Sequence, residues 1–70
     1  MLMKNVFPER FKMLRQDKEI GQIALAKELG VGKSTISQWE TGKCEPKLSN
    51  LIAMAKFFDV SIDYLAGLED

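Results

Sequence analysis

The chain has 70 residues, 46% of them hydrophobic and 29% charged, and its ten basic side chains balance ten acidic ones. A chain of this length forms a single domain with a small core, which leaves little room for a catalytic cleft between two layers. With no histidine and one cysteine, a histidine-based catalytic triad is excluded, and a zinc site nearly so.

Apolar residues recur at helical spacing along the whole chain, and no stretch has the alternation of a β-strand. Pro8 suits the first turn of a helix, where its missing N–H is no loss, and Gly30 suits a left-handed C-terminal cap. Ser61 can cap the last helix through its hydroxyl group. The sequence therefore predicts five helices, at about 7–17, 22–29, 33–40, 48–58 and 61–65.

The helix expected at 48–58 has the clearest stripe of core positions. Its apolar residues recur at i, i+3, i+4, i+7 and i+10, namely Leu48, Leu51, Ile52, Ala55 and Phe58. We expect this stripe to face the core of one all-α domain. The domain covers residues 6–67, and we expect residues 1–5 and 68–70 to be frayed.

Residues 30–35 read GVGKST, which looks like the end of the phosphate-binding loop of nucleotide-binding proteins. That loop needs its first glycine where this chain has Lys27, and it must follow a buried β-strand. The preceding residues, QIALAKEL at 22–29, have a helical period instead. A nucleotide-binding or enzymatic role is therefore disfavoured, and a turn between two short helices explains the stretch.

Residues 22–41 behave as one unit of two short helices joined by this glycine turn. Ala26 supplies the small side chain needed where crossing helices approach, and Gly30 tolerates a positive φ. Five apolar side chains are expected in a shared core: Leu25, Leu29, Val31, Ile36 and Trp39. The outer face of the second helix is polar and carries no acidic group: Lys33, Ser34, Thr35, Ser37 and Gln38. This pattern is typical of a helix-turn-helix.

From Phe11 to Leu65 the chain resembles the phage repressor and Cro class of helix-turn-helix regulators, the XRE family. The resemblance rests on the joint order of several motifs: LR at 14–15, LAKELGV at 25–31, STISQWE and GK between 34 and 43, Pro46, and DVSIDYLAG at 59–67. It implies a compact five-helix, lambda-repressor-like DNA-binding domain. It also implies a sequence-specific transcriptional regulator, most often a bacterial or phage repressor, with helix 33–40 in the major groove.

The resemblance assigns roles to individual residues. Base contacts are expected from the outer face of helix 33–40, through Lys33, Ser34, Gln38, Thr35 and Ser37. Phosphate contacts are expected at the start of helix 22–29 and after helix 33–40, through Gln22, Lys43 and Lys47. Arg15 and Glu40 match a family pair that forms a structural salt bridge.

An exposed apolar patch is expected near the C-terminal end, formed by Phe57, Tyr64 and Leu68, and it is a candidate dimer interface. One such domain reads only a few base pairs, so we expect a homodimer on a palindromic operator in double-stranded DNA, with half-sites about 34 Å apart. We expect no cofactor, metal, small-molecule ligand or catalytic activity.

The location and the main alternative also follow from the sequence. No apolar run is long enough to span a membrane, the N-terminus lacks the apolar core of a secretory signal, and Cys44 has no internal disulfide partner. We therefore expect a cytoplasmic protein without membrane contact. The alternative function is a helix-turn-helix adaptor or antitoxin that acts mainly through protein–protein contacts. The neutral net charge favours this alternative, whereas the acid-free face of helix 33–40 argues against it.

Overall fold

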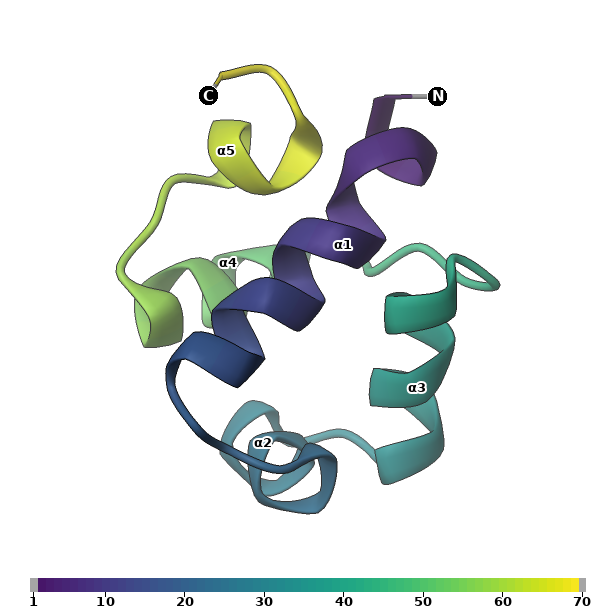
Figure 1. The fold of residues 1–70 in the computed structure, drawn as a ribbon, viewed down its shortest axis with the longest axis vertical. Coiled ribbons are helices and arrows are strands. Elements are labelled where there is room, and N and C mark those ends of the chain that lie inside the picture. The colour runs from purple at the N-terminus through teal and green to yellow at the C-terminus, as the bar shows by residue number, and fades with distance from the viewer. Residues whose placement is uncertain (1, 70) are drawn as a thin grey trace.

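The computed structural model describes residues 2–69, which fold into five α-helices within 27 × 24 × 21 Å (Figure 1). The helices are α1 (Leu2–Asp17), α2 (Gln22–Leu29), α3 (Lys33–Thr41), α4 (Leu48–Phe58) and α5 (Ile62–Ala66). The central helix is α1, and it packs against α3 on one side and α5 on another (Figure 1). None of the helices in the described part of the chain has the length and hydropathy needed to cross a membrane.

The first helix begins earlier than the sequence predicts. It starts at Leu2 rather than near residue 7, so Pro8 lies inside α1 and not in its first turn. A proline removes one backbone donor, and a helix can continue through it with a local distortion. The ring of Pro8 also lies beside Gly42, the residue that caps the end of α3: its Cγ is 3.5 Å from the position that a Cβ on Gly42 would take.

The frayed ends expected at residues 1–5 and 68–70 stay a prediction, and residues 1 and 70 lie outside the described residues. The expected domain boundary at residue 6 does not coincide with a helix end, since α1 runs through it.

Aromatic side chains of α1 form the centre of the core. Phe7 and Phe11 are 1% and 0% exposed, and their rings stack with centroids 5.3 Å apart. Phe11 also meets the ring of Trp39 edge-on at 5.7 Å, an arrangement that aromatic pairs favour. The other buried apolar residues are Leu25, Ala26, Leu29, Ile36, Leu51, Met54, Ala55 and Leu65. The core expected for residues 22–41 is therefore confirmed, with Val31 half-buried at its edge.

Helix α4 buries a different face from the predicted stripe. Leu51 and Ala55 are buried as expected, but Leu48 is 65% and Ile52 40% exposed, while Met54 is fully buried. Most of α4 is apolar, so two neighbouring stripes fit the helical period equally well. Packing against α5 and α2 selects the stripe that contains Met54.

Candidate nucleic-acid interface

The stretch GVGKST forms the turn from α2 to α3. Gly30 ends α2 in the left-handed conformation at φ 71°, and the N–H of Val31 donates to the carbonyl of Ala26 at 3.0 Å. Gly32 then precedes α3 in an extended conformation. Because an L side chain at Gly30 would be strained, glycine makes this tight turn possible and brings Lys33 to the exposed start of α3.

The five predicted base-contact residues all lie on α3. The exposed ones are Lys33, Ser34 and Gln38, and the half-buried ones are Thr35 and Ser37. The opposite face of the helix enters the core through Ile36 and Trp39, which are 0% and 3% exposed. The core thus holds α3 in place while its polar face stays accessible.

The loop after α3 folds back onto the helix. The backbone carbonyl of Gln38 accepts hydrogen bonds from the N–H of Lys43 at 2.9 Å and of Cys44 at 3.4 Å. Lys43 is exposed and is held close to the end of α3 by this bond. Lys47 is also exposed and is the N-cap residue of α4, where its side chain makes no capping bond. Lysines therefore follow α3 on the loop that continues from it.

The N-terminal ends of α2 and α3 carry no side-chain cap. Gly21 precedes α2 and Gly32 precedes α3, and neither can offer a side-chain acceptor. By contrast, the hydroxyl of Ser61 caps α5 by accepting a hydrogen bond from the N–H of Tyr64 at 2.9 Å, as the sequence predicts. The first N–H groups of α2 and α3 are therefore available to an anion, which the helix dipole attracts.

An open hollow of about 680 Å³ lies at the start of α2. Residues 21–24 line it together with Arg15, Lys27 and Lys33, and no acidic residue is among those that line it. Lys27 and Lys33, together with the free N–H groups at the start of α2, suit a phosphate group, whereas the nitrogens of Arg15 donate within the protein.

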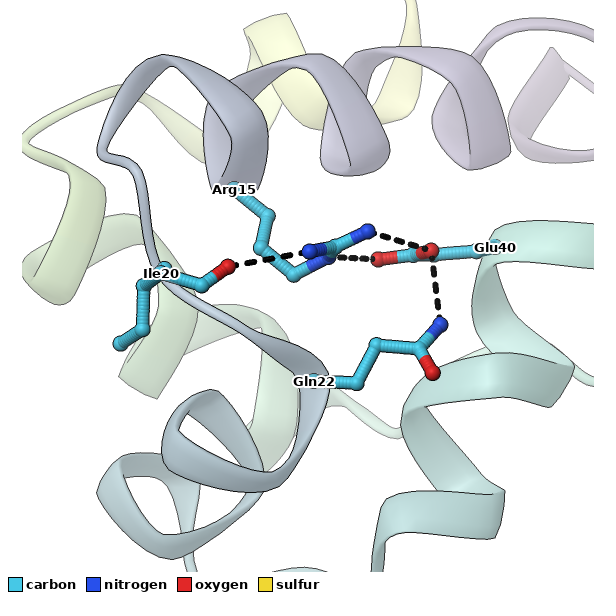
Figure 2. A network of polar contacts seen from close by, with 4 residues as sticks. All are labelled: Arg15, Ile20, Gln22 and Glu40. Carbon is cyan, nitrogen blue, oxygen red and sulfur yellow. Dashed lines mark hydrogen bonds and ion pairs between the residues drawn. The ribbon is translucent and has the colours of Figure 1, made fainter.

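Arg15 and Glu40 join α1 to α3 in this region (Figure 2). The Nε of Arg15 donates to Oε2 of Glu40 at 2.5 Å and its Nη2 to Oε1 at 3.3 Å. Arg15 Nη1 also donates to the carbonyl oxygen of Ile20 at 3.0 Å. Only 14% of the Arg15 side chain and 5% of the Glu40 side chain are exposed, so the two charges compensate each other away from bulk water.

Gln22 is a third member of this network, which sequence reasoning missed. Its amide nitrogen Nε2 donates to Oε1 of Glu40 at 3.0 Å, and Figure 2 shows the amide oxygen directed away from the carboxylate. The sequence places Gln22 at the start of a helix but holds no signal that pairs it with a residue 18 positions later. The predicted phosphate contact of Gln22 therefore shares its amide with an internal hydrogen bond.

A family model described as helix-turn-helix matches residues 11–65. The chain belongs to this helix-turn-helix family. The helix-turn-helix domain is 41% identical over 64 residues to the transcriptional activator BcrR of Enterococcus faecalis. The aligned region covers 91% of this chain and 31% of that protein. It is 44% identical over 57 residues to repressor protein C2 of Salmonella phage P22. Here the aligned region covers 81% of this chain and 26% of that protein. The chain thus spans about a third or less of the length of these two relatives.

Solved structures of the P22 repressor are also similar to the helix-turn-helix domain. The crystal structure of the P22 c2 repressor in complex with synthetic operator 9T has a TM-score of 0.83 and 41% identity, covering 87% of this chain and 92% of that chain. The solution structure of the DNA-binding domain of the same repressor has a TM-score of 0.80 and 40% identity, covering 89% of this chain and 82% of that chain. The all-α, five-helix repressor fold that the sequence implies is therefore confirmed.

The predicted interface residues of the helix-turn-helix domain differ in exposure. Leu68 is 62% exposed, whereas Phe57 and Tyr64 are half-buried. The Nζ of Lys18 lies 5.1 Å from the ring centroid of Phe57, and the guanidinium carbon of Arg10 lies 4.4 Å from that of Tyr64. Basic side chains of α1 and the following turn therefore cover parts of Phe57 and Tyr64, and the dimer interface at these residues stays a prediction.

Proposed function

We propose that this helix-turn-helix domain binds double-stranded DNA sequence-specifically and represses transcription, with α3 in the major groove. One observation carries the proposal most directly. The polar outer face of α3 is free of unpaired carboxylates, and the core holds it beside two uncapped helix N-termini and an open hollow whose lining includes Lys27 and Lys33. One relative is named as a transcriptional activator and another as a repressor protein, which supports a regulatory binding role without catalysis.

The dimensions of α3 suit this role. An α-helix with its side chains is about 10–12 Å across, which matches the width of the major groove of about 12 Å. We assign base contacts to the outer face of the helix: Lys33, Ser34, Gln38, Thr35 and Ser37. We assign phosphate contacts to residues at its flanks: Gln22, Lys43 and Lys47. Phosphate contacts position the protein, and base contacts give the sequence preference.

Part of the acidic charge lies toward the C-terminal end, so a net charge of zero is compatible with DNA binding. Acidic side chains gather toward the C-terminal end, at Asp59, Asp63 and Glu69. Figure 1 shows α5 at the opposite end of the molecule from α2. The carboxylate of Asp63 on α5 is therefore remote from the phosphate contact proposed at the start of α2 (Figure 1), and solvent ions screen charges over about 10 Å.

A homodimer on a palindromic operator completes the proposal, since two copies double the base contacts and fix the spacing of the half-sites. We place the interface at the C-terminal surface, which comprises Phe57, Tyr64 and Leu68. We also propose a cytoplasmic location, where the DNA of a bacterium or phage would be accessible.

Selection of bound sequences from a random duplex pool tests the proposal. We expect a palindrome whose half-sites lie about one helical turn apart. Affinity for that site should fall steeply as salt rises, because each phosphate contact releases counterions. A promoter that contains the site should be repressed in a reporter assay. No binding to any duplex at low salt would refute the function and would favour a role in protein–protein contacts.

A further inference from the structure

The hydrogen bond between Gln22 and Glu40 has a consequence for DNA binding. Glu40 belongs to the last turns of α3, whereas Gln22 is the first residue of α2 and lines the basic hollow. Their bond therefore links the start of one helix of the helix-turn-helix directly to the end of the other (Figure 2).

The bond also fixes which way the Gln22 amide points. One hydrogen of Nε2 goes to Glu40, so the amide oxygen turns away and the second hydrogen stays available for another acceptor. Without the carboxylate, the amide could rotate and present its oxygen, which a phosphate would repel. In the orientation seen here, one N–H of the amide is held by Glu40 and the other can donate to an anion.

We propose that Glu40 is a positioning residue for the phosphate contact at the start of α2. It holds the Gln22 amide as a donor beside the free N–H groups that follow Gly21. Arg15 makes this arrangement possible, because it neutralises a carboxylate that would otherwise repel the phosphate. The inference rests on the proposed function and goes beyond the structural role expected for the Arg15–Glu40 pair.

Two substitutions separate positioning from stability. In Glu40→Gln the side chain has one oxygen left, and the charged Arg15 attracts it. The new amide nitrogen then faces Nε2 of Gln22, and because both nitrogens are donors they form no hydrogen bond. The side chain keeps its size and shape, although its charge is removed, while the orientation of Gln22 is lost. Gln22→Leu removes the donor itself, and Gln16→Leu, at an exposed position of α1 that does not line the basic hollow, is the matched control.

The experiment measures binding to the selected operator and to duplexes that carry one methylphosphonate each, at a temperature where circular dichroism shows every variant folded. We expect Gln22→Leu and Glu40→Gln each to weaken operator binding by about 3- to 10-fold, with no change in base preference. In the parent protein, a methylphosphonate at one particular phosphate should weaken binding, and both variants should lose this sensitivity. The double variant should bind no more weakly than the weaker of the two single variants. Gln16→Leu should bind like the parent protein.

Other results would overturn the inference. Glu40→Gln could lower the melting temperature yet bind every duplex as tightly as the parent protein, or it could keep the phosphate sensitivity that Gln22→Leu loses. Multiplicative effects in the double variant would also show that the two residues act independently. If the parent protein bound no duplex at all, the proposed function would fail first and the inference with it.

Discussion

At the scale of single residues, Glu40 shows how a carboxylate can belong to a helix that is proposed to meet DNA. Three donors surround it, two from Arg15 and one from Gln22, and 5% of its side chain is exposed. Its charge is therefore compensated within the protein and is not presented to a phosphate. The same contacts connect three helices, so this residue contributes both to the fold and to the geometry of the interface.

We expect Glu40→Ala to lower the free energy of unfolding by about 3 kcal/mol, because it leaves the largely covered guanidinium of Arg15 without its partner. Urea denaturation measures this change. Glu28→Ala, at an exposed position of α2, is the matched control and should cost less than about 0.5 kcal/mol. An unchanged melting temperature together with an altered base preference would contradict the expectation.

At the scale of elements, α3 depends on its two ends. Its start is uncapped and carries Lys33, and its end is closed by Gly42, which lies at φ 79° and packs beside Pro8 of α1. The loop then returns Lys43 toward the helix through a backbone bond. A lysine therefore lies at each end of α3: Lys33 on the helix itself and Lys43 on the loop that follows it.

The two lysines should respond differently to substitution. Lys33→Ala is expected to relax preference at one base pair of the operator and to cost about 1–3 kcal/mol there, because a base-edge contact is lost. Lys43→Ala should weaken all sequences alike and lower the salt slope by about 1, as the loss of a phosphate contact does. Sequence selection and salt titration on both variants measure the two effects, and equal behaviour of the two variants would contradict the assignment.

The end of α3 gives a prediction about stability. Gly42→Ala places a Cβ in the left-handed conformation and should destabilise the domain by about 1–2 kcal/mol. Asp59 ends α4 in the same conformation, at φ 58°, although it is not a glycine. Asp59→Gly should therefore leave stability unchanged or raise it. Thermal and urea unfolding of both variants test the pair, and destabilisation by Asp59→Gly would show that its side chain has another role.

At the scale of the whole molecule, the proposed contacts with DNA and with a second copy lie on different parts of the surface. The hollow and the free helix ends belong to α2 and α3, while the proposed dimer surface belongs to α4, α5 and the residues after them. On the C-terminal surface Leu68 is the most exposed apolar side chain, because Lys18 and Arg10 cover parts of Phe57 and Tyr64. This makes Leu68 the position to test.

Leu68→Glu is expected to weaken binding to the full palindrome by at least tenfold, about 1.4 kcal/mol, and to leave binding to a single half-site unchanged. A charge at the interface opposes association of two copies but not the contacts of one copy with DNA. Ile52→Glu is the matched control, since Ile52 is an exposed apolar residue outside the C-terminal surface. If Ile52→Glu alone disrupted the dimer, the interface would lie on the face of α4 that carries Ile52 instead.

Local sequence determined most of the architecture. Helical periodicity, the left-handed glycine at residue 30 and the serine cap at residue 61 are properties of neighbouring residues, so the five helices and the turn between α2 and α3 could be predicted. The polar face of α3 follows in the same way, because Ile36 and Trp39 define the opposite, buried face.

Only the tertiary structure decided features that depend on contacts between distant residues. It extended α1 through Pro8, chose the face of α4 that contains Met54, and covered Phe57 with Lys18. It also paired Gln22 with Glu40 through two side-chain atoms 3.0 Å apart. Periodicity within one helix cannot specify such choices, because they are set by the side chains that a neighbouring helix presents.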